Sequence, residues 1–135
     1  MAMYSPTLKR FIMRIRLLPL VTLALACTFA SLAQAEVPVK TADGILVTST
    51  GMTLYTFDKD TPNKSTCNGP CATQWPPAMA AAGAKPEGDM SIVMRDDGAR
   101  QWAYMGKPVY LYAKDKNPGD KTGDNFKDIW HVIKK

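Results

Sequence analysis

An internal repeat constrains this chain of 135 residues more than any other feature of its sequence. When the sequence is shifted against itself by 55 residues, "GMTLYTFDKD" at 51–60 aligns without a gap with "GKPVYLYAKD" at 106–115. Chance would supply one or two identities but not the whole set, so we expect one structural unit to occur twice. The paired positions are Gly51 and Gly106, Leu54 and Val109, Tyr55 and Tyr110, Phe57 and Tyr112, Lys59 and Lys114, Asp60 and Asp115, and Trp75 and Trp130.

Each copy of the repeat predicts a β-hairpin followed by a long, turn-rich loop. In the first copy, the β-branched and apolar residues 45–49 lead through a Thr-Gly turn into a second strand at 53–57. In the second copy, residues 102–104 lead through a Met-Gly turn into 108–112. Pro108 has no N–H to donate, so we expect it to start its strand or to lie on an outer edge.

Three further segments complete the expected secondary structure. A hairpin is predicted from residues 91–94 to Gln101, because the Asp-Asp-Gly sequence between them suits a tight turn. Residues 129–133 are predicted to form the last strand. The alanine-rich segment 76–89 is predicted to be a short helix or a linker, since two prolines precede the alanines and Gly83 ends them.

One small, mostly β domain is the expected architecture. The 100 residues that follow position 35 are too few for two separate cores, so the two repeats should pack against each other with pseudo-twofold symmetry. The domain is expected to span residues 36–135. We place the repeats at about 41–77 and 96–133, with a linker at about 78–90 between them.

Residues 1–35 have the pattern of a secretory signal peptide. A cationic stretch precedes an apolar run that is too short for a transmembrane helix, and Ala33-Gln34-Ala35 fits a cleavage site. Cleavage there would leave Glu36 at the start of the exported chain. Two alternatives are open: translation from Met13, and acylation of Cys27 as in a lipoprotein, which the residues before Cys27 disfavour.

Export changes the charge balance of the chain. The leader carries 4 of the 17 Lys and Arg residues and no acidic residue, which leaves 13 basic residues against 12 acidic ones. The resulting net charge of +1 provides no electrostatic footprint for nucleic acid. The expected location is extracytoplasmic, either periplasmic or secreted, with a lipid anchor in the envelope as the alternative. Such compartments are oxidising.

The aromatic residues of the two repeats are expected to form the core. Strand alternation puts the two strand aromatics of each copy on one face. Fully burying such side chains contributes about 2–3 kcal/mol each, which is large for a domain of this size. An aromatic pocket for a ligand is the alternative. The residues concerned are Tyr55, Phe57, Trp75, Trp102, Tyr110, Tyr112 and Trp130.

Asp60 and Asp115 each begin a turn, where an aspartate carboxylate accepts hydrogen bonds from backbone N–H groups two residues on. Cation binding is the rival explanation, but neither loop has the spacing of a known calcium loop. A scaffold needs its residues in every copy, whereas one catalytic centre needs them once. The repetition therefore favours a structural role for both aspartates.

The repeated Tyr-x-aromatic-x-x-Asp pattern resembles the signature of a bacterial family of secreted repeats, often called predicted lipoproteins. The flanking segments "CNGPCATQWPP" and "GKPVYLYAKDKNPGDKTGDNFKDIWHVI" resemble that family too. The resemblance implies an extracytoplasmic repeat protein. It supplies no catalytic residue, because the family has no assigned activity. The matching residues are Tyr55, Phe57 and Asp60 in the first copy and Tyr110, Tyr112 and Asp115 in the second.

Cys67 and Cys71 occur in the first copy only and are expected to form a disulfide, since Gly-Pro between them lets the chain turn sharply. Closing this short loop contributes about 2 kcal/mol by the chain-entropy estimate. Copper(I) binding is the alternative, because thiolates and thioethers suit this ion. Zinc would need more ligands than two sulfurs and His131 provide. The methionines available to copper are Met52, Met79, Met90, Met94 and Met105.

His131 lies between Trp130 and Val132 in the expected last strand, so alternation points it away from them and outward. The sequence has no evident Ser-His-Asp or Cys-His order, no phosphate loop and no haem motif, so we expect no cofactor and no enzymatic activity. The sequence predicts a secreted or periplasmic, non-catalytic binding or structural module of the cell envelope. Its partner would be an unknown envelope component or small molecule, and the alternative is a copper-binding or chaperone protein.

Overall fold

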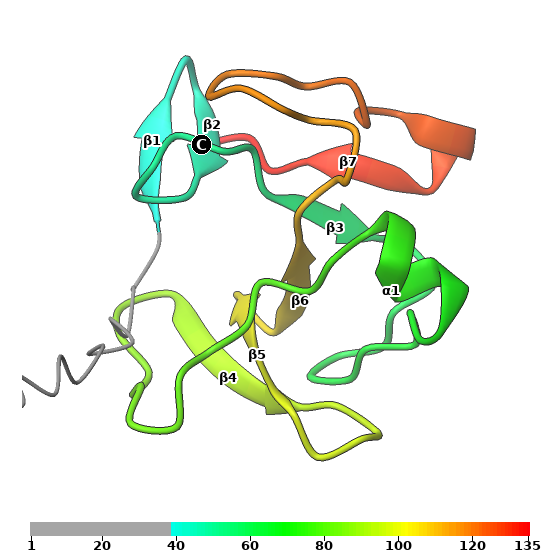
Figure 1. Ribbon diagram of the computed structural model, residues 1–135. Helices are drawn as coiled ribbons and strands as arrows, with labels where there is room; N and C mark the ends of the chain where they lie inside the picture. Colours follow the sequence, from blue (N-terminus) through cyan, green and yellow to red (C-terminus); the bar gives the residue numbers. More distant parts are fainter. Residues whose placement is uncertain (1–38) are drawn as a thin grey trace, which may run out of the picture. The chain divides into compact units, whose positions relative to one another are not determined.

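The computed structural model describes residues 39–135. The expected signal peptide at 1–35, including Cys27, lies outside these residues. The described part is mostly β, as predicted, and its strands form two antiparallel sheets (Figure 1). The strands are β1 (Lys40–Ala42), β2 (Ile45–Val47), β3 (Tyr55–Phe57), β4 (Met90–Met94), β5 (Arg100–Tyr104), β6 (Lys107–Tyr110) and β7 (Trp130–Val132).

The larger sheet has five strands in the order β4-β5-β6-β3-β7, and β1 and β2 form a two-stranded sheet of their own. The predicted hairpin from 91–94 to Gln101 is confirmed as β4 and β5, and the predicted last strand is confirmed as β7. The hairpin of the second copy is confirmed as β5 and β6. The prediction for Pro108 is wrong, because it is the second residue of β6, the central strand of the sheet, where it pairs with Ala103 of β5. Pairing of β6 with β3 begins only at Val109, so the missing N–H of Pro108 falls outside that ladder.

The first copy differs from the prediction, because its two expected strands pair only briefly. Val47 bridges Thr53 across a tight turn, and β3 then leaves β2 to lie between β6 and β7. The partner of β2 along its length is β1, which the sequence did not predict. A three-residue strand with the sequence Lys-Thr-Ala carries little apolar pattern, so its pairing depends on β2.

The alanine-rich segment forms no helix, contrary to one of the two predictions for it. It runs as an irregular strap along β5, where the Ala80 N–H donates to the Arg100 carbonyl at 2.9 Å. The Arg100 guanidinium donates to the carbonyls of Ala81 and Ala84, both at 2.7 Å, and holds the end of the strap. The described chain has its α-helix elsewhere, in the cysteine loop, as the five-residue α1 (Pro70–Gln74).

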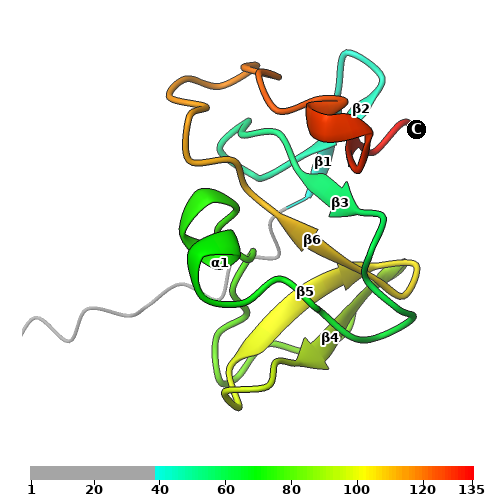
Figure 2. The same cartoon turned by 90° about the vertical axis from the view of Figure 1, so that its right-hand side faces the viewer.

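A pseudo-twofold axis passes between β3 and β6, which run antiparallel with Tyr55 opposite Tyr110 (Figure 2). The two halves repeat the same pairings. Thr56 pairs with His131 of β7 in one half, and in the other half Leu111 donates its N–H to the Pro76 carbonyl at 2.7 Å. The symmetry that the sequence repeat predicts is therefore present in the backbone.

Two hydrophobic clusters pack on opposite faces of the central strand pair. Alternation turns Leu54 and Val109 to one face, where they join Trp102 and the buried alanines of the strap. Tyr55 and Tyr110 turn to the other face and join Trp75, Tyr112 and Trp130. The second cluster holds most of the repeated motif.

Candidate functional site

The repeated tyrosines and aspartates pair across the two repeats. The Tyr55 hydroxyl donates to Asp115 Oδ2 at 2.6 Å, and the Tyr110 hydroxyl donates to Asp60 Oδ2 at the same distance. Each tyrosine thus donates a hydrogen bond to the aspartate of the other copy. Both tyrosines are fully buried, and hydrogen bonds to charged acceptors are stronger than those between neutral groups.

Each aspartate also orders the loop that follows it. Asp60 Oδ1 accepts from the Thr66 N–H at 2.7 Å, and Asp115 Oδ1 accepts from the Thr122 N–H at 3.0 Å. The expected bond from an N–H two residues on is wrong for both positions. The donor lies six or seven residues on because each aspartate closes a wide loop, and at Asp60 the second residue on is Pro62, which has no N–H.

Burial changes the protonation equilibria of these groups. Desolvation raises the pKa of the Tyr55 and Tyr110 hydroxyls well above the usual range, and the hydrogen bond to the carboxylate raises it further. Desolvation also raises the pKa of Asp60, which the hydrogen bonds from Tyr110 and Thr66 partly oppose. The tyrosines therefore remain proton donors at every pH at which proteins usually function.

A stack of four aromatic rings follows the same symmetry. Trp75 and Trp130 lie face to face at its centre, 3.9 Å apart and 3° from parallel. Tyr112 stacks on the outer face of Trp75 at 4.1 Å, and Phe57 stacks on the outer face of Trp130 at 4.2 Å. These rings pack face to face, and together with the tyrosine–aspartate pairs they give every residue of the repeated motif a contact with the core. Phe57 and Asp60 are only half-buried.

The loop that holds Cys67 and Cys71, here called the cysteine loop, has its cysteines in the first copy only. The sulfurs of Cys67 and Cys71 lie at disulfide distance, 2.03 Å, and Cys67 is fully buried. Arg95, which is buried, donates from Nη2 to the Cys67 carbonyl at 2.6 Å and from Nη1 to Ser65 Oγ at 3.0 Å. Sequence reasoning missed Arg95, because an arginine before Asp-Asp-Gly in a hairpin has the pattern of a solvated turn.

The cysteines of the copper alternative are joined in a disulfide in this structure. The most exposed methionines are Met79, Met94 and Met105, and the first and last of these lie against opposite ends of β5. Within residues 39–135, no group of three or more His, Cys, Asp or Glu side chains is placed to hold a metal ion. Copper binding would in addition require reduction of the disulfide.

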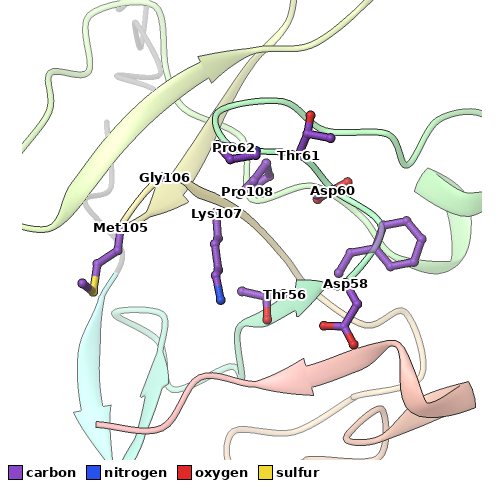
Figure 3. Close-up of a pocket in the computed structure, with 10 residues that line it drawn as sticks. Thr56, Asp58, Asp60, Thr61, Pro62, Met105, Gly106, Lys107 and Pro108 are labelled. Carbon is purple, nitrogen blue, oxygen red and sulfur yellow. The ribbon is translucent and has the colours of Figure 1, made fainter.

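A surface with polar and charged side chains that the core does not use lies over β3, β6 and β7. Two adjoining cavities of about 340 and 510 Å³ share Thr56, Asp58, Met105 and Lys107. Figure 3 shows the lining of the smaller one. We call the two cavities together the Thr56 groove. The first cavity is completed by Phe57, Asp60, Thr61, Pro62, Gly106 and Pro108, and the second by Tyr104 and residues 131–134.

His131 forms one wall of the Thr56 groove, on the side opposite Trp130 and Val132 as alternation predicts. Its Nε2 lies 2.8 Å from Asp58 Oδ2, and its Nδ1 lies 3.1 Å from Asn125 Oδ1. The ring is half-buried and held at both nitrogens. In Figure 3, Lys107 extends from the β5–β6 turn towards Thr56, with Asp58 beside it at the end of β3.

The groove breaks the symmetry of the molecule. At the equivalent positions of the other copy, Thr56 is replaced by Leu111, Asp58 by Ala113, His131 by Pro76, Lys107 by Met52 and Lys134 by Met79. The pairing of the central strand with its outer neighbour is the same in both halves, although the hairpins differ. The scaffold therefore does not require polar side chains at these positions, and the groove carries them for another reason.

The fold, the crossed tyrosine–aspartate pairs and the single cysteine loop define a duplicated all-β repeat protein. The family model Lipoprotein_15, described as "Secreted repeat of unknown function", matches residues 37–79 and again 91–134. The chain belongs to this family of secreted repeats, as its resemblance in sequence predicted. No curated protein and no solved structure matched the chain. None of the helices within residues 39–135 is long and apolar enough to cross a membrane.

Proposed function

We propose that this protein is a non-catalytic binding module of the bacterial cell envelope and that the Thr56 groove is its ligand site. One observation carries the proposal: the two halves pair their central strands in the same way, and only one half bears threonine, aspartate, histidine and lysine side chains around a cavity. A cavity of about 510 Å³ lies within the range of about 300–1,000 Å³ that small-molecule sites occupy.

The arrangement in the groove favours binding over catalysis. His131 is held between Asp58 and Asn125, and neither cavity is lined by a serine or cysteine to which it could act as a base. Thr56 is the hydroxyl residue next to it in the sheet, and it lies within a regular strand pair. Such side chains serve well as hydrogen-bonding groups that orient a ligand.

We further propose that the protein acts outside the cytoplasm, in the periplasm or the medium, after cleavage that leaves Glu36 as the first residue. Intact mass of the exported protein tests this. A mass that corresponds to residues 36–135 less two hydrogens supports the soluble form with its disulfide. A lipid on Cys27 would replace it with an anchored form.

Amide shifts of the isotope-labelled exported protein test the binding proposal. Size-fractionated soluble components of the native envelope are added, and the amides of Thr56, Lys107 and His131 are expected to shift together. The amides of Leu111 and Met52, at the equivalent positions of the other half, serve as the internal control. Shifts that cluster away from the groove, or no shift with any fraction, would contradict the proposal.

Two single variants locate the site. Asp58→Ala should change the pattern of the shifts, because it removes a carboxylate from the groove and releases His131 from its 2.8 Å contact. Met52→Ala changes a partly buried side chain at the position equivalent to Lys107 and should leave binding unchanged. An enzyme would instead consume one of the added components. Spectra of the small molecules in the same samples would reveal that loss.

A further inference from the structure

We infer that the Thr56 groove binds an amphiphilic anion: a small molecule with a carboxylate or phosphate group next to an apolar body. This inference rests on the proposed function and names the class of ligand. It is carried by the charges of the larger cavity, by its apolar wall and by the residues that stand at the equivalent positions of the other half.

The larger cavity has two ammonium groups that no carboxylate neutralises. Lys107 and Lys134 both line it, and neither takes part in an ion pair within residues 39–135. Asp58 is the one carboxylate in its lining, and it lies against His131 at 2.8 Å. Lys135 Nζ donates to the Tyr104 hydroxyl at 2.8 Å beside the cavity, but it also pairs with Asp89 at 3.7 Å and adds no free charge. The cavity is therefore cationic.

The smaller cavity has the opposite character. Asp60 and Asp58 both line it, with Lys107 as its one cation. Asp60 is already occupied by the Tyr110 hydroxyl and by Thr66. The charge of the groove thus changes sign along its length, and an anionic group is expected at the β7 end, between Lys107 and Lys134.

An apolar wall lies beside these cations. Tyr104, Met105 and Ile133 line the same cavity. Met105 is 69 % exposed and sits at the β5–β6 turn with a φ of 48°, in the left-handed region that such side chains seldom adopt. An exposed thioether of this kind adapts to irregular apolar ligands. The combination suits a ligand with an apolar body and a charged end.

The other half of the molecule shows that the fold forms without these charges. Met52 and Met79 stand at the positions of Lys107 and Lys134. The substitutions Lys107→Met and Lys134→Met therefore place in the groove the residues that the scaffold already accepts. Both lysines are exposed, so the double variant should fold. Lys114→Met with Lys121→Met, two exposed lysines outside the groove, is the matched control.

The experiment titrates the exported protein at low ionic strength with decyl phosphate and with decanoate, both below their micelle concentrations. Decyltrimethylammonium and decyl maltoside are the cationic and neutral comparisons. We expect both anions to shift the groove amides and to bind about tenfold more tightly than the other two, because two ammonium groups attract the head group. The Lys107→Met, Lys134→Met variant should lose about tenfold for the anions only, and the control variant nothing.

The arms of the experiment distinguish a free anionic ligand from an anionic lipid surface. They also distinguish failure of this inference from failure of the proposed function. Binding of the free amphiphiles, with or without binding to phosphatidylglycerol vesicles, supports the inference, whereas binding to vesicles alone overturns it. Equal affinities for the four amphiphiles, or anion affinity that the double variant keeps, overturns the inference but leaves the groove as a binding site. If envelope fractions shift the groove amides and no amphiphile does, the inference alone fails. If nothing shifts them, the proposed function fails as well.

Discussion

Tyr55 and Tyr110 explain why the repeated pattern of this chain extends over six positions. The tyrosine donates to the aspartate of the other copy, the aromatic residue two positions on joins the ring stack, and the aspartate orders its own loop. Because the tyrosine of one copy donates to the aspartate of the other, neither copy alone can form these hydrogen bonds. This mutual requirement gives a structural reason for the pattern to occur in both copies.

The tyrosine pairs predict alkaline destabilisation. Unfolded tyrosine loses its proton near pH 10, while the folded pKa of Tyr55 and Tyr110 is raised far above that value by burial and by the carboxylates. Above pH 10 the unfolded chain therefore binds fewer protons than the folded chain, and stability falls as pH rises. The expected slope is about 1.4 kcal/mol per pH unit for each tyrosine, measured by urea denaturation between pH 9 and 11.5.

The control is Tyr55→Phe, which removes one of the two groups. Its tyrosine-dependent slope above pH 10 should be about half that of the unmodified protein. At neutral pH it should lose about 1–3 kcal/mol, because the buried carboxylate of Asp115 loses its donor. A slope that Tyr55→Phe leaves unchanged would contradict the assignment.

Gly123 lies against the ring stack, where any side chain would overlap with it. A Cβ at this position would lie 2.5 Å from Trp75 Cη2 and 2.9 Å from Tyr112 Cδ1. We expect Gly123→Ala to cost about 1–3 kcal/mol and to alter the near-ultraviolet circular dichroism of the stacked tryptophans. Gly83→Ala is the matched control, because a Cβ there meets nothing within 4 Å. Equal stability of the two variants would show that the stack is loosely packed.

At the scale of elements, the cysteine loop is stabilised by two devices. The disulfide closes the loop on itself, and Arg95 connects it to the β4–β5 hairpin through the Cys67 carbonyl, Ser65 and Gln101. The second copy has neither device and places Gly123 near the Tyr55 hydroxyl instead. The loop with the cysteines thus depends on covalent and charged contacts where its counterpart depends on packing.

Replacing both cysteines by serine should lower the free energy of unfolding by about 2 kcal/mol, the entropy of closing so short a loop. The fold should remain, because Arg95 and Asp60 still order the loop from outside. Denaturation of the oxidised protein, the reduced protein and the double variant checks this. Full stability of the double variant would remove the structural role of the disulfide.

Arg95→Leu is the complementary change in the same element. It should cost more than the loss of the disulfide, about 3 kcal/mol or more, because it leaves the Cys67 carbonyl and the Gln101 side chain buried without a donor. The measurement is the midpoint of urea denaturation at pH 7. A smaller loss than that of the double cysteine variant would show that the network is dispensable.

At the scale of the whole molecule, the loop of each repeat is hydrogen-bonded to the hairpin of the other. The Asn63 N–H of the first loop donates to the Gly106 carbonyl of the second hairpin at 2.8 Å. In the reverse direction, the Gly119 N–H donates to the Gly51 carbonyl at 3.1 Å, and Gly51 packs against Pro118. Loops, tyrosine–aspartate pairs and ring stack all run between the copies, so they form one core.

Because the two repeats share one core, they should unfold together. Calorimetry is expected to show a single transition whose calorimetric and van't Hoff enthalpies agree, although the chain contains two similar units. A change confined to one copy, such as Tyr110→Phe, should shift the whole transition and leave it single. Two resolved transitions would mean that the copies are separate folding units.

The strands and the core aromatics could be predicted from the sequence because their causes are local. Alternation along a strand, Asp-Gly at a turn and the 55-residue repeat identified β4 to β7 and the face of Tyr55 and Tyr110. The same repeat determined that the molecule would have two similar halves. It also determined its membership of a family of secreted repeats.

Only the tertiary structure decided which tyrosine donates to which aspartate, and where the Thr56 groove lies. Tyr55 and Asp115 are 60 residues apart, and Asp58 and His131 are 73 apart, so no local period connects them. The burial of Arg95 also depends on a loop that folds back from a distant part of the chain. Contacts of this kind are determined by the packing of the repeats as a pair, because the symmetry axis between β3 and β6 brings each motif to the other copy.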